Sequence, residues 1–192
     1  MMDKSDQTDV VLRLLQALES KGSPRGETQV QKSAFFVDRG LEHKLDLDFI
    51  LYRYGPYSFK LNKMLGRLRS SYHVYLSPNP SGSGSSIGIT SSGLSLIKKS
   101  PAPPLLTDRA IEFTAERFGR LGVARLEQLA TALYVTRHQP GDASVDLGPN
   151  PSVWSRASEL CRLKPHIALN VATDAVKMID LWLSQASAEG HR

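Results

Sequence analysis

The sequence has one cysteine, no long hydrophobic run and a long stretch without acidic residues. A lone cysteine, Cys161, excludes an internal disulfide framework and a zinc site built from cysteines. The apolar runs extend over only a few residues, as at 49–51, so no segment predicts a membrane span of about 20 residues. The chain begins with charged residues rather than a signal-peptide pattern. We therefore expect a cytoplasmic protein without a membrane partner.

The charge distribution is uneven along the chain. Residues 1–100 hold 14 basic and 9 acidic residues, a net charge of +5, whereas residues 101–192 hold 10 of each. Between Phe49 and Thr107 there is no acidic residue. The seven basic residues of that stretch are Arg53, Lys60, Lys63, Arg67, Arg69, Lys98 and Lys99. Such an excess predicts a surface for a polyanion or an acidic protein, or else an ordinary solvated face without a partner.

Hydrophobic periodicity predicts a mainly α protein with a small antiparallel β wing, an α+β class. The order helix, helix, strand, helix and hairpin is that of a winged-helix-like core. The expected helices of this core cover 7–20, 27–39, 57–70 and 91–99, and the expected strands 48–54, 73–77 and 87–90. The pair Gly55-Pro56 is expected to end the first strand.

The second part of the chain predicts a helical bundle. A core of residues 1–100 is followed by a proline connection at 101–106, a helical lobe at 107–187 and a tail at 188–192. The lobe is expected to pack on the core, because its helices carry more large apolar side chains than four short helices can hide. Its expected features are a helix with its N-cap at Thr107, a helix at 122–136, a loop at 139–151, a helix from a cap at Ser152 to Leu163, and a last helix from Asn170.

The helix at 57–70 carries the candidate binding residues. Its apolar side chains form one stripe, and its cations Lys60, Lys63 and Arg67 lie beside that stripe. Long cations suit phosphate contacts, although an ordinary surface helix has the same pattern. Further candidates for contact with DNA bases or with a partner protein are Asn62, Arg69, Tyr72 and Tyr75. We expect the replacement of Lys60, Lys63 and Arg67 by glutamate to abolish partner binding without unfolding the protein.

The polar segment 78–86 lies between the two wing strands and is rich in Ser, Gly and Pro. Residues 79–86 of this segment are predicted to form a mobile hairpin tip in which nothing is buried and which tolerates shortening.

Motifs for catalysis lack their structural context. Residues 84–88 match a nucleophile-elbow pattern, but they lead into a strand instead of joining a strand to a helix. Residues 95–98 match one penicillin-binding motif without its two companions. The five histidines are scattered, and no glycine-rich phosphate loop follows a strand. We therefore expect a protein that is not an enzyme, with no cofactor, metal or catalytic residue.

Several short motifs resemble one group of bacterial families. Val30-Gln31-Lys32, followed by Phe35-Phe36, is similar to the "LQK…aromatic" signature of the Panacea (SocA-like antitoxin) and YwgA-like families. Tyr54-Gly55-Pro56-Tyr57-Ser58, with Leu61 and Leu65, is similar to their "YGPYS…L…L" motif. Weaker similarities, shared in part with the C-terminal domain of macrodomain antitoxins, lie at Ile89-Thr90 with Gly93, at 129–134 and at 163–167.

This resemblance implies a non-enzymatic protein encoded near toxins or phage-defence genes. Its expected function is to dock onto and neutralise or regulate a partner protein, such as a toxin or a defence effector, with homo-oligomerisation open. A winged-helix transcriptional regulator that binds DNA is the alternative. Within the motif, Gly55 allows a tight turn, and the fixed φ of Pro56 is expected to favour the backbone conformation at the start of the next helix. The rings of Tyr54 and Tyr57 either pack the strand–helix corner or serve an interface.

Overall fold

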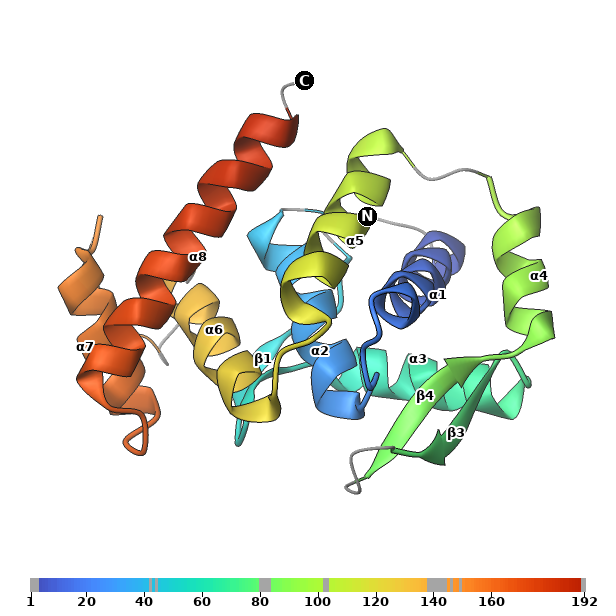
Figure 1. The fold of residues 1–192 in the computed structure, drawn as a ribbon, viewed down its shortest axis with the longest axis horizontal. Coiled ribbons are helices and arrows are strands. Elements are labelled where there is room, and N and C mark those ends of the chain that lie inside the picture. Colours follow the sequence, from blue (N-terminus) through green and yellow to red (C-terminus); the bar gives the residue numbers. More distant parts are fainter. Residues whose placement is uncertain are drawn as a thin grey trace.

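The computed structural model describes residues 4–41, 43, 45–79, 84–101, 104–137, 145, 147–148 and 150–190. Over these residues the protein has eight α-helices, one π-helical turn and two antiparallel sheets of two strands each (Figure 1). The mainly α, α+β class that the sequence predicts is therefore confirmed. None of the described helices is long and apolar enough to cross a membrane.

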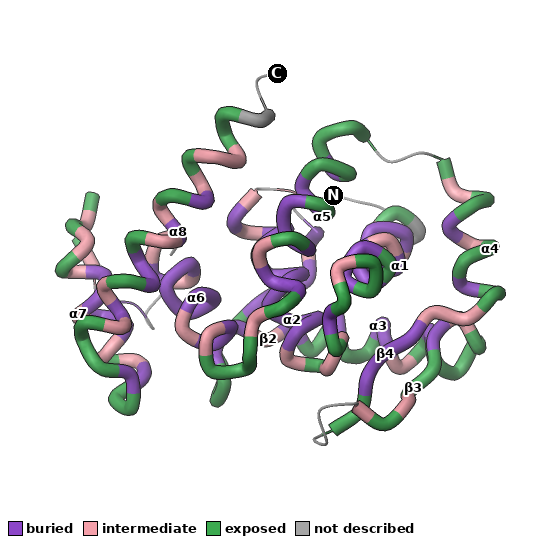
Figure 2. Tube along the Cα trace, viewed as in Figure 1, coloured by how far each residue is buried: buried purple, intermediate pink, exposed green. Residues whose placement is uncertain are grey.

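The first two helices form the centre of the fold. Helix α1 (Lys4–Ser20) covers the first range expected. Helix α2 (Glu27–Phe35) covers the second only together with the π-helical turn that continues it, η1 (Phe36–Gly40). Most residues of α2 are buried (Figure 2). They include the polar Gln31 and Lys32. A helix this polar can be central only if other elements supply hydrogen-bond partners for its buried groups.

The segment after η1 differs from the expected single strand. Strand β1 (Ile50–Tyr52) turns back into strand β2 (Gly55–Tyr57), with Leu51 opposite Pro56. The prediction that Gly55-Pro56 ends the strand is wrong, because Gly55 has φ +87° and lets the chain reverse into a hairpin. The role expected for Pro56 in starting the next helix is also wrong. Helix α3 (Phe59–Ser70) begins after Ser58, whose Oγ accepts from Leu61 N at 2.9 Å.

The wing follows α3 as expected. Strand β3 (Val74–Pro78) pairs antiparallel with strand β4 (Ser85–Ile89), and helix α4 (Ser91–Lys99) comes next. Residues 80–83 of the expected mobile tip lie outside the described residues. The prediction that nothing at 79–86 is buried is wrong for Ser86, whose hydroxyl donates to Pro24 O. A bridge between Gly26 and Ser86, with Ile87 N donating to Arg25 O at 3.0 Å, pairs the free edge of β4 with the chain before α2.

Four helices complete the chain: α5 (Leu105–Phe118), α6 (Val123–Thr136), α7 (Val153–Leu163) and α8 (Leu169–Gly190). Thr107 is not the N-cap that the sequence predicts; α5 begins two residues earlier, after Pro104, and Thr107 is buried within it. Ser152 caps α7 as expected, and α8 runs past the boundary expected at 187. Most of the expected loop at 139–151, and residues 102–103 of the proline connection, lie outside the described residues.

The C-terminal helices share a hydrophobic core with the N-terminal ones. Helix α5 packs on α1 and α2, α6 packs on α2, and α8 packs on α6 and α7 (Figure 1). At the centre, the ring of Phe36 lies 4.9 Å from Phe118 and 6.1 Å from Trp182, measured between centroids. These rings come from η1, α5 and α8, so large apolar side chains of both halves of the chain are buried against one another.

Candidate functional site

Gln31 and Ser58, two of the motif residues, bind each other deep in the protein. The side-chain amide of Gln31 donates to Ser58 O at 3.1 Å, and its oxygen accepts from Ser58 N at 2.9 Å. The hydroxyl of Ser58 also donates to Leu47 O. Both side chains are fully buried. They fix the start of α3 against α2, which is a structural role, so neither is available to a partner.

Lys32 is buried beneath the β1–β2 hairpin. Its Nζ donates to Pro56 O at 2.7 Å, and only 2% of the residue is exposed. Burial lowers the pKa of Lys32 from its ordinary 10.5 to about 8, although the charge of Glu127 opposes this shift. The lysine thus holds the returning strand of the hairpin to α2.

A second buried lysine holds the same hairpin from the other end of the chain. Lys164 Nζ donates to Tyr52 O at 3.0 Å and to Arg53 O. It also lies 3.3 Å from Glu127 Oε1, while Glu127 Oε2 lies 3.5 Å from His166 Nε2. Lys164 and His166 belong to the motif at 163–167. Glu127 was missed by the sequence analysis, although a carboxylate between the apolar positions of α6 is a signal for a buried ion pair.

The hairpin turn approaches α6 closely at Gly55. A Cβ added there would lie 3.2 Å from Thr131 Oγ1 and 3.5 Å from Lys32 Cε. The hydroxyl of Thr131 is buried and forms no hydrogen bond among the described residues. Because the φ of Gly55 is also positive, a larger residue would be strained as well as crowded. The buried motif residues therefore set the position of the hairpin, whose outer side chains face solvent.

The outer side chains of the hairpin and the first residue of α3 form a surface that we name the aromatic patch: Ile50, Tyr52, Tyr54 and Tyr57 of the hairpin, and Phe59 of α3. The rings of Tyr52, Tyr57 and Phe59 lie within 5.7 Å of one another, measured between centroids. All five are exposed except Tyr57, which is half-buried. Large apolar side chains that gather at the surface in this way are typical of interaction sites.

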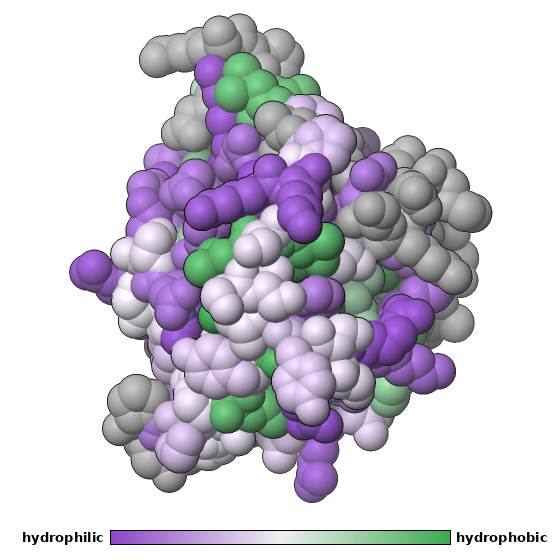
Figure 3. All heavy atoms as spheres, turned by 90° about the vertical axis from the view of Figure 1, so that its right-hand side faces the viewer, coloured by the Kyte–Doolittle hydropathy of each residue, from purple (hydrophilic) through white to green (hydrophobic). Residues whose placement is uncertain are grey.

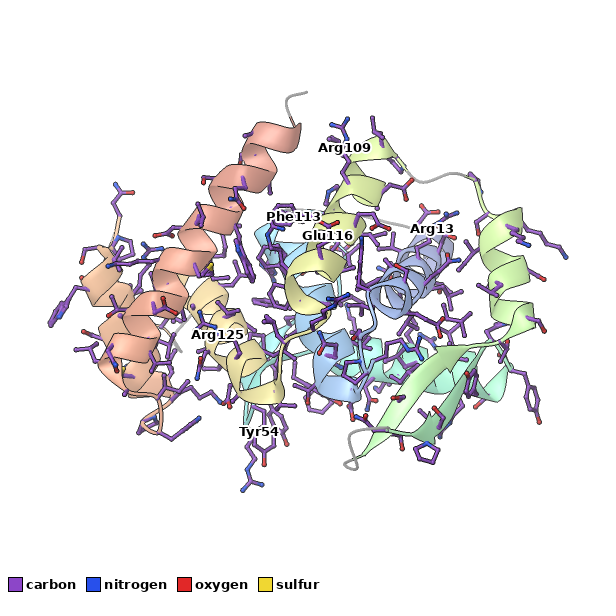
Figure 4. All side chains as sticks on the ribbon, in the orientation of Figure 1. Arg13, Tyr54, Arg109, Phe113, Glu116 and Arg125 are labelled. Carbon is purple, nitrogen blue, oxygen red and sulfur yellow. The ribbon has the colours of Figure 1, made fainter. Side chains whose placement is uncertain are left out.

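The two motif tyrosines have different surroundings. Tyr54 is 58% exposed and extends away from the body at the end of the hairpin (Figure 4). Of the two interpretations offered for this ring, packing at the strand–helix corner is therefore wrong. The guanidinium of Arg53 lies 5.8 Å from the centroid of its ring. Tyr57 packs on its neighbours and donates to Glu27 Oε1 at 2.8 Å. Burial, with a smaller effect from Glu27, raises the pKa of Tyr57 to about 12.

The cations predicted on α3 do not form one site. At 100° per residue, Lys60, Lys63 and Arg67 lie on one flank of the helix and Asn62 and Arg69 on the other. Lys60 Nζ lies 2.5 Å from Asp48 Oδ2. The carboxylate of Asp48, which comes just before the acid-free stretch in the sequence, therefore offsets the charge of Lys60. The seven basic residues of that stretch therefore present a smaller positive field than the sequence suggests.

The two tyrosines of the wing, which the sequence offers as candidates for partner contact, are exposed. Tyr72 is 81% exposed in the turn after α3, and Tyr75 is 46% exposed on β3. The ring of Tyr75 covers Gly88 of β4, where a Cβ would lie 2.3 Å from its Cζ. On this side of the molecule, hydrophobic side chains reach the surface in small areas among hydrophilic ones (Figure 3). The wing thus carries exposed large side chains of its own, Tyr72, Tyr75 and Leu76, apart from those of the aromatic patch.

A groove that the sequence analysis missed lies between α3 and the wing. It has a volume of about 810 Å³ and is closed at its other sides by the start of α2 and the α5–α6 turn. Asn62 and Arg69 line it, together with Arg120 and apolar side chains of α3 and the wing. Its walls come from segments up to about a hundred residues apart, so no local pattern could have predicted it.

The structure gives the rejected catalytic motifs ordinary structural roles. Ser86, the central serine of the elbow pattern, lies within strand β4 instead of at a strand–helix turn. Cys161 is half-buried, donates to Ile167 O at 3.3 Å, and has its thiol pKa raised by burial. Among the described residues no three His, Cys, Asp or Glu side chains are grouped to hold a metal ion.

A comparison with protein-family models and a comparison with curated proteins each find no match to this chain. The relation of its motifs to the Panacea and YwgA-like families therefore stays a prediction, carried by the residues that meet at the β1–β2 hairpin.

Proposed function

We propose that the protein is a non-enzymatic binding module, antitoxin-like or associated with phage defence, that docks onto a partner protein through the aromatic patch. The observation that carries this proposal is the exposure of four large apolar side chains on one hairpin and the adjoining helix start. Tyrosine and phenylalanine supply large contact areas at a low cost in conformational entropy, and such residues dominate binding energies at protein interfaces. The motif resemblance supports the same class of function.

The support beneath the patch strengthens the proposal. A two-stranded hairpin is marginal alone. Here Lys32 and Lys164 hold three of its carbonyl groups, and Gly55 packs against α6. Buried charges are costly to keep, so their use to position an exposed hairpin favours a functional role for that hairpin. A surface held in its binding geometry also loses less entropy on association.

Replacement of Tyr52 and Tyr54 by serine is expected to lower affinity for the partner at least 100-fold, because exposed aromatic anchors typically contribute about 2 kcal/mol each. The measurement is affinity capture with the tagged full chain from the native host, followed by binding assays with the captured protein. Trp154→Ser is the matched control, since Trp154 is 68% exposed but lies on α7, outside the patch. Equal capture by the patch variant and the control would refute the proposal.

DNA binding through a winged helix is the second candidate, favoured by the strand pairing near the wing. The Arg25–Gly26 segment lies between α1 and α2 and contacts β4 through an isolated antiparallel bridge, Gly26 to Ser86, and the hydrogen bond from Ile87 N to Arg25 O. Helix α3 would then be the groove-reading helix, with Lys63 and Arg67 as phosphate contacts. The ion pair of Lys60 with Asp48 weakens this candidate.

If DNA binding is the function, glutamate at Lys60, Lys63 and Arg67 should flatten the dependence of affinity on salt. Each lost phosphate contact changes the slope of log K against log salt by about 0.9. Fluorescence anisotropy with a labelled duplex at several salt concentrations measures this slope. The control variant carries glutamate at three other exposed positions, Arg109, Arg137 and Lys177, which lie on other helices or at their ends. Its net charge changes by the same amount as that of the α3 variant. No binding by the unmodified protein at low salt would exclude the regulator function.

A further inference from the structure

The groove between α3 and the wing combines an apolar floor with a basic rim. The floor is formed by Leu65 of α3 and by Val74, Leu76 and Ile87 of the wing. Arg69 stands at the α3 side and Arg120 at the α5–α6 turn. The groove has a volume of about 810 Å³, which is enough to hold several side chains of a ligand. An apolar concave site with a few polar groups at its edge is typical of ligand-binding sites.

The electrostatics of the groove favour a negatively charged occupant. Glu27 is the one carboxylate among the described lining residues, and it accepts the hydrogen bond of Tyr57. Helices α2 and α6 also begin at the groove, after Gly26 and Gly122, and neither has a side-chain cap. The N–H groups of their first turns, which have no partner within the helix, add positive potential to that of the two guanidinium groups.

The groove is continuous with the aromatic patch. Phe59, Asn62, Gly66 and Arg69 follow one another at helical spacing along one face of α3, from the patch into the groove. The hydrogen bond from Tyr57 to Glu27 joins the two surfaces on the side of α2. A partner seated on the patch could therefore place an adjoining segment in the groove.

We propose that the groove receives an acidic, amphipathic peptide segment of the partner protein. This inference rests on the proposed function. The apolar side chains of the segment occupy the floor at Leu65 and Leu76, and its carboxylates pair with Arg69 and Arg120. A nucleic acid is a poorer occupant, because phosphate contacts use cations and amides and would leave the apolar floor uncovered.

The test uses a displayed library of random 16-residue peptides selected on the immobilised full chain. We expect the selected peptides to combine spaced Leu, Ile or Phe residues with an excess of Asp and Glu. Arg69→Gln/Arg120→Gln and Leu76→Ser should each weaken their binding at least tenfold, and Leu76 is 46% exposed, so its replacement leaves the core intact. In NMR titrations, shifts should gather at amides of Thr28, Gly66 and Gly122.

Selected peptides of neutral or basic composition, or peptides that bind the arginine variant equally, would overturn the inference. So would binding of a duplex DNA, but of no peptide, at the same amides. Tyr52→Ser/Tyr54→Ser separates the two proposals. If that variant loses the native partner while no acidic peptide is selected, the groove inference fails and the binding-module proposal stands. If acidic peptides are selected but the patch variant keeps the partner, the role of the patch fails.

Discussion

Expressed separately, the fragments 1–100 and 105–192 are expected to be insoluble or to lack a cooperative unfolding transition. Each would expose the apolar surface that the other covers. Helix α1 would lose α5, and the ring of Phe36 would lose Phe113, Phe118 and Trp182. Removing one buried Phe or Trp side chain from a core typically costs about 3–5 kcal/mol, so the loss of three such side chains from around Phe36 is comparable to the usual stability of a whole domain.

Polar contacts across the same boundary point to the same result. The amide of Gln29 donates to Phe118 O in the buried interior, and Lys164 donates to the hairpin carbonyls. In either fragment these groups would be left exposed or unpaired. The measurement is thermal unfolding followed by near-ultraviolet circular dichroism on each fragment and on an equimolar mixture.

The control is the full chain carrying a protease site in the proline connection and cleaved after folding. This nicked protein should stay one particle in gel filtration and melt cooperatively. Two soluble fragments that each melt cooperatively would show autonomous domains and contradict the packing of the lobe on the core. Molten fragments that regain structure when mixed would support it.

Glu127→Gln is expected to lower the free energy of unfolding by about 3–5 kcal/mol at pH 7. The substitution removes the carboxylate beside two buried ammonium groups, and an uncompensated buried charge is strongly destabilising. Urea denaturation measures the change. Glu116→Gln is the control: Glu116 pairs with Lys21 at the surface, at 3.1 Å, and its loss should cost less than about 1 kcal/mol. Equal, small changes for both variants would show that the buried cluster contributes little.

The lowered pKa of Lys32 predicts a rise in stability at alkaline pH. Between about pH 8 and its unfolded value of 10.5, the unfolded chain binds more protons at this lysine than the folded protein does. The free energy of unfolding therefore gains a contribution that increases with pH over this window. The shift corresponds to about 3 kcal/mol in full. Lys32→Met should lack this rise between pH 8 and 10, and parallel pH profiles for the two proteins would contradict the assignment.

Local sequence patterns were sufficient for most elements. The apolar stripe at 10–18, the Ser152 cap and the alternation in the wing depend on neighbours a few residues away. The order of elements and the α+β class follow from them. Where the local pattern had two interpretations, prediction failed: Gly55-Pro56 suits a strand end and a hairpin turn equally, and contact with α6 selects the hairpin.

The binding surfaces required contacts across the whole chain. Lys164 and Tyr52 are separated by 112 positions, and Arg69 and Arg120 reach the same groove from elements that share no sequence pattern. Lys32 and Lys164 are buried and support the hairpin, whereas Tyr54, for which the sequence left packing and interface contact open, is exposed. The residue types, the charge excess and the motif residues could be identified from the chain alone. Which side chains are desolvated and which face solvent could not, because desolvation depends on every element that packs around them.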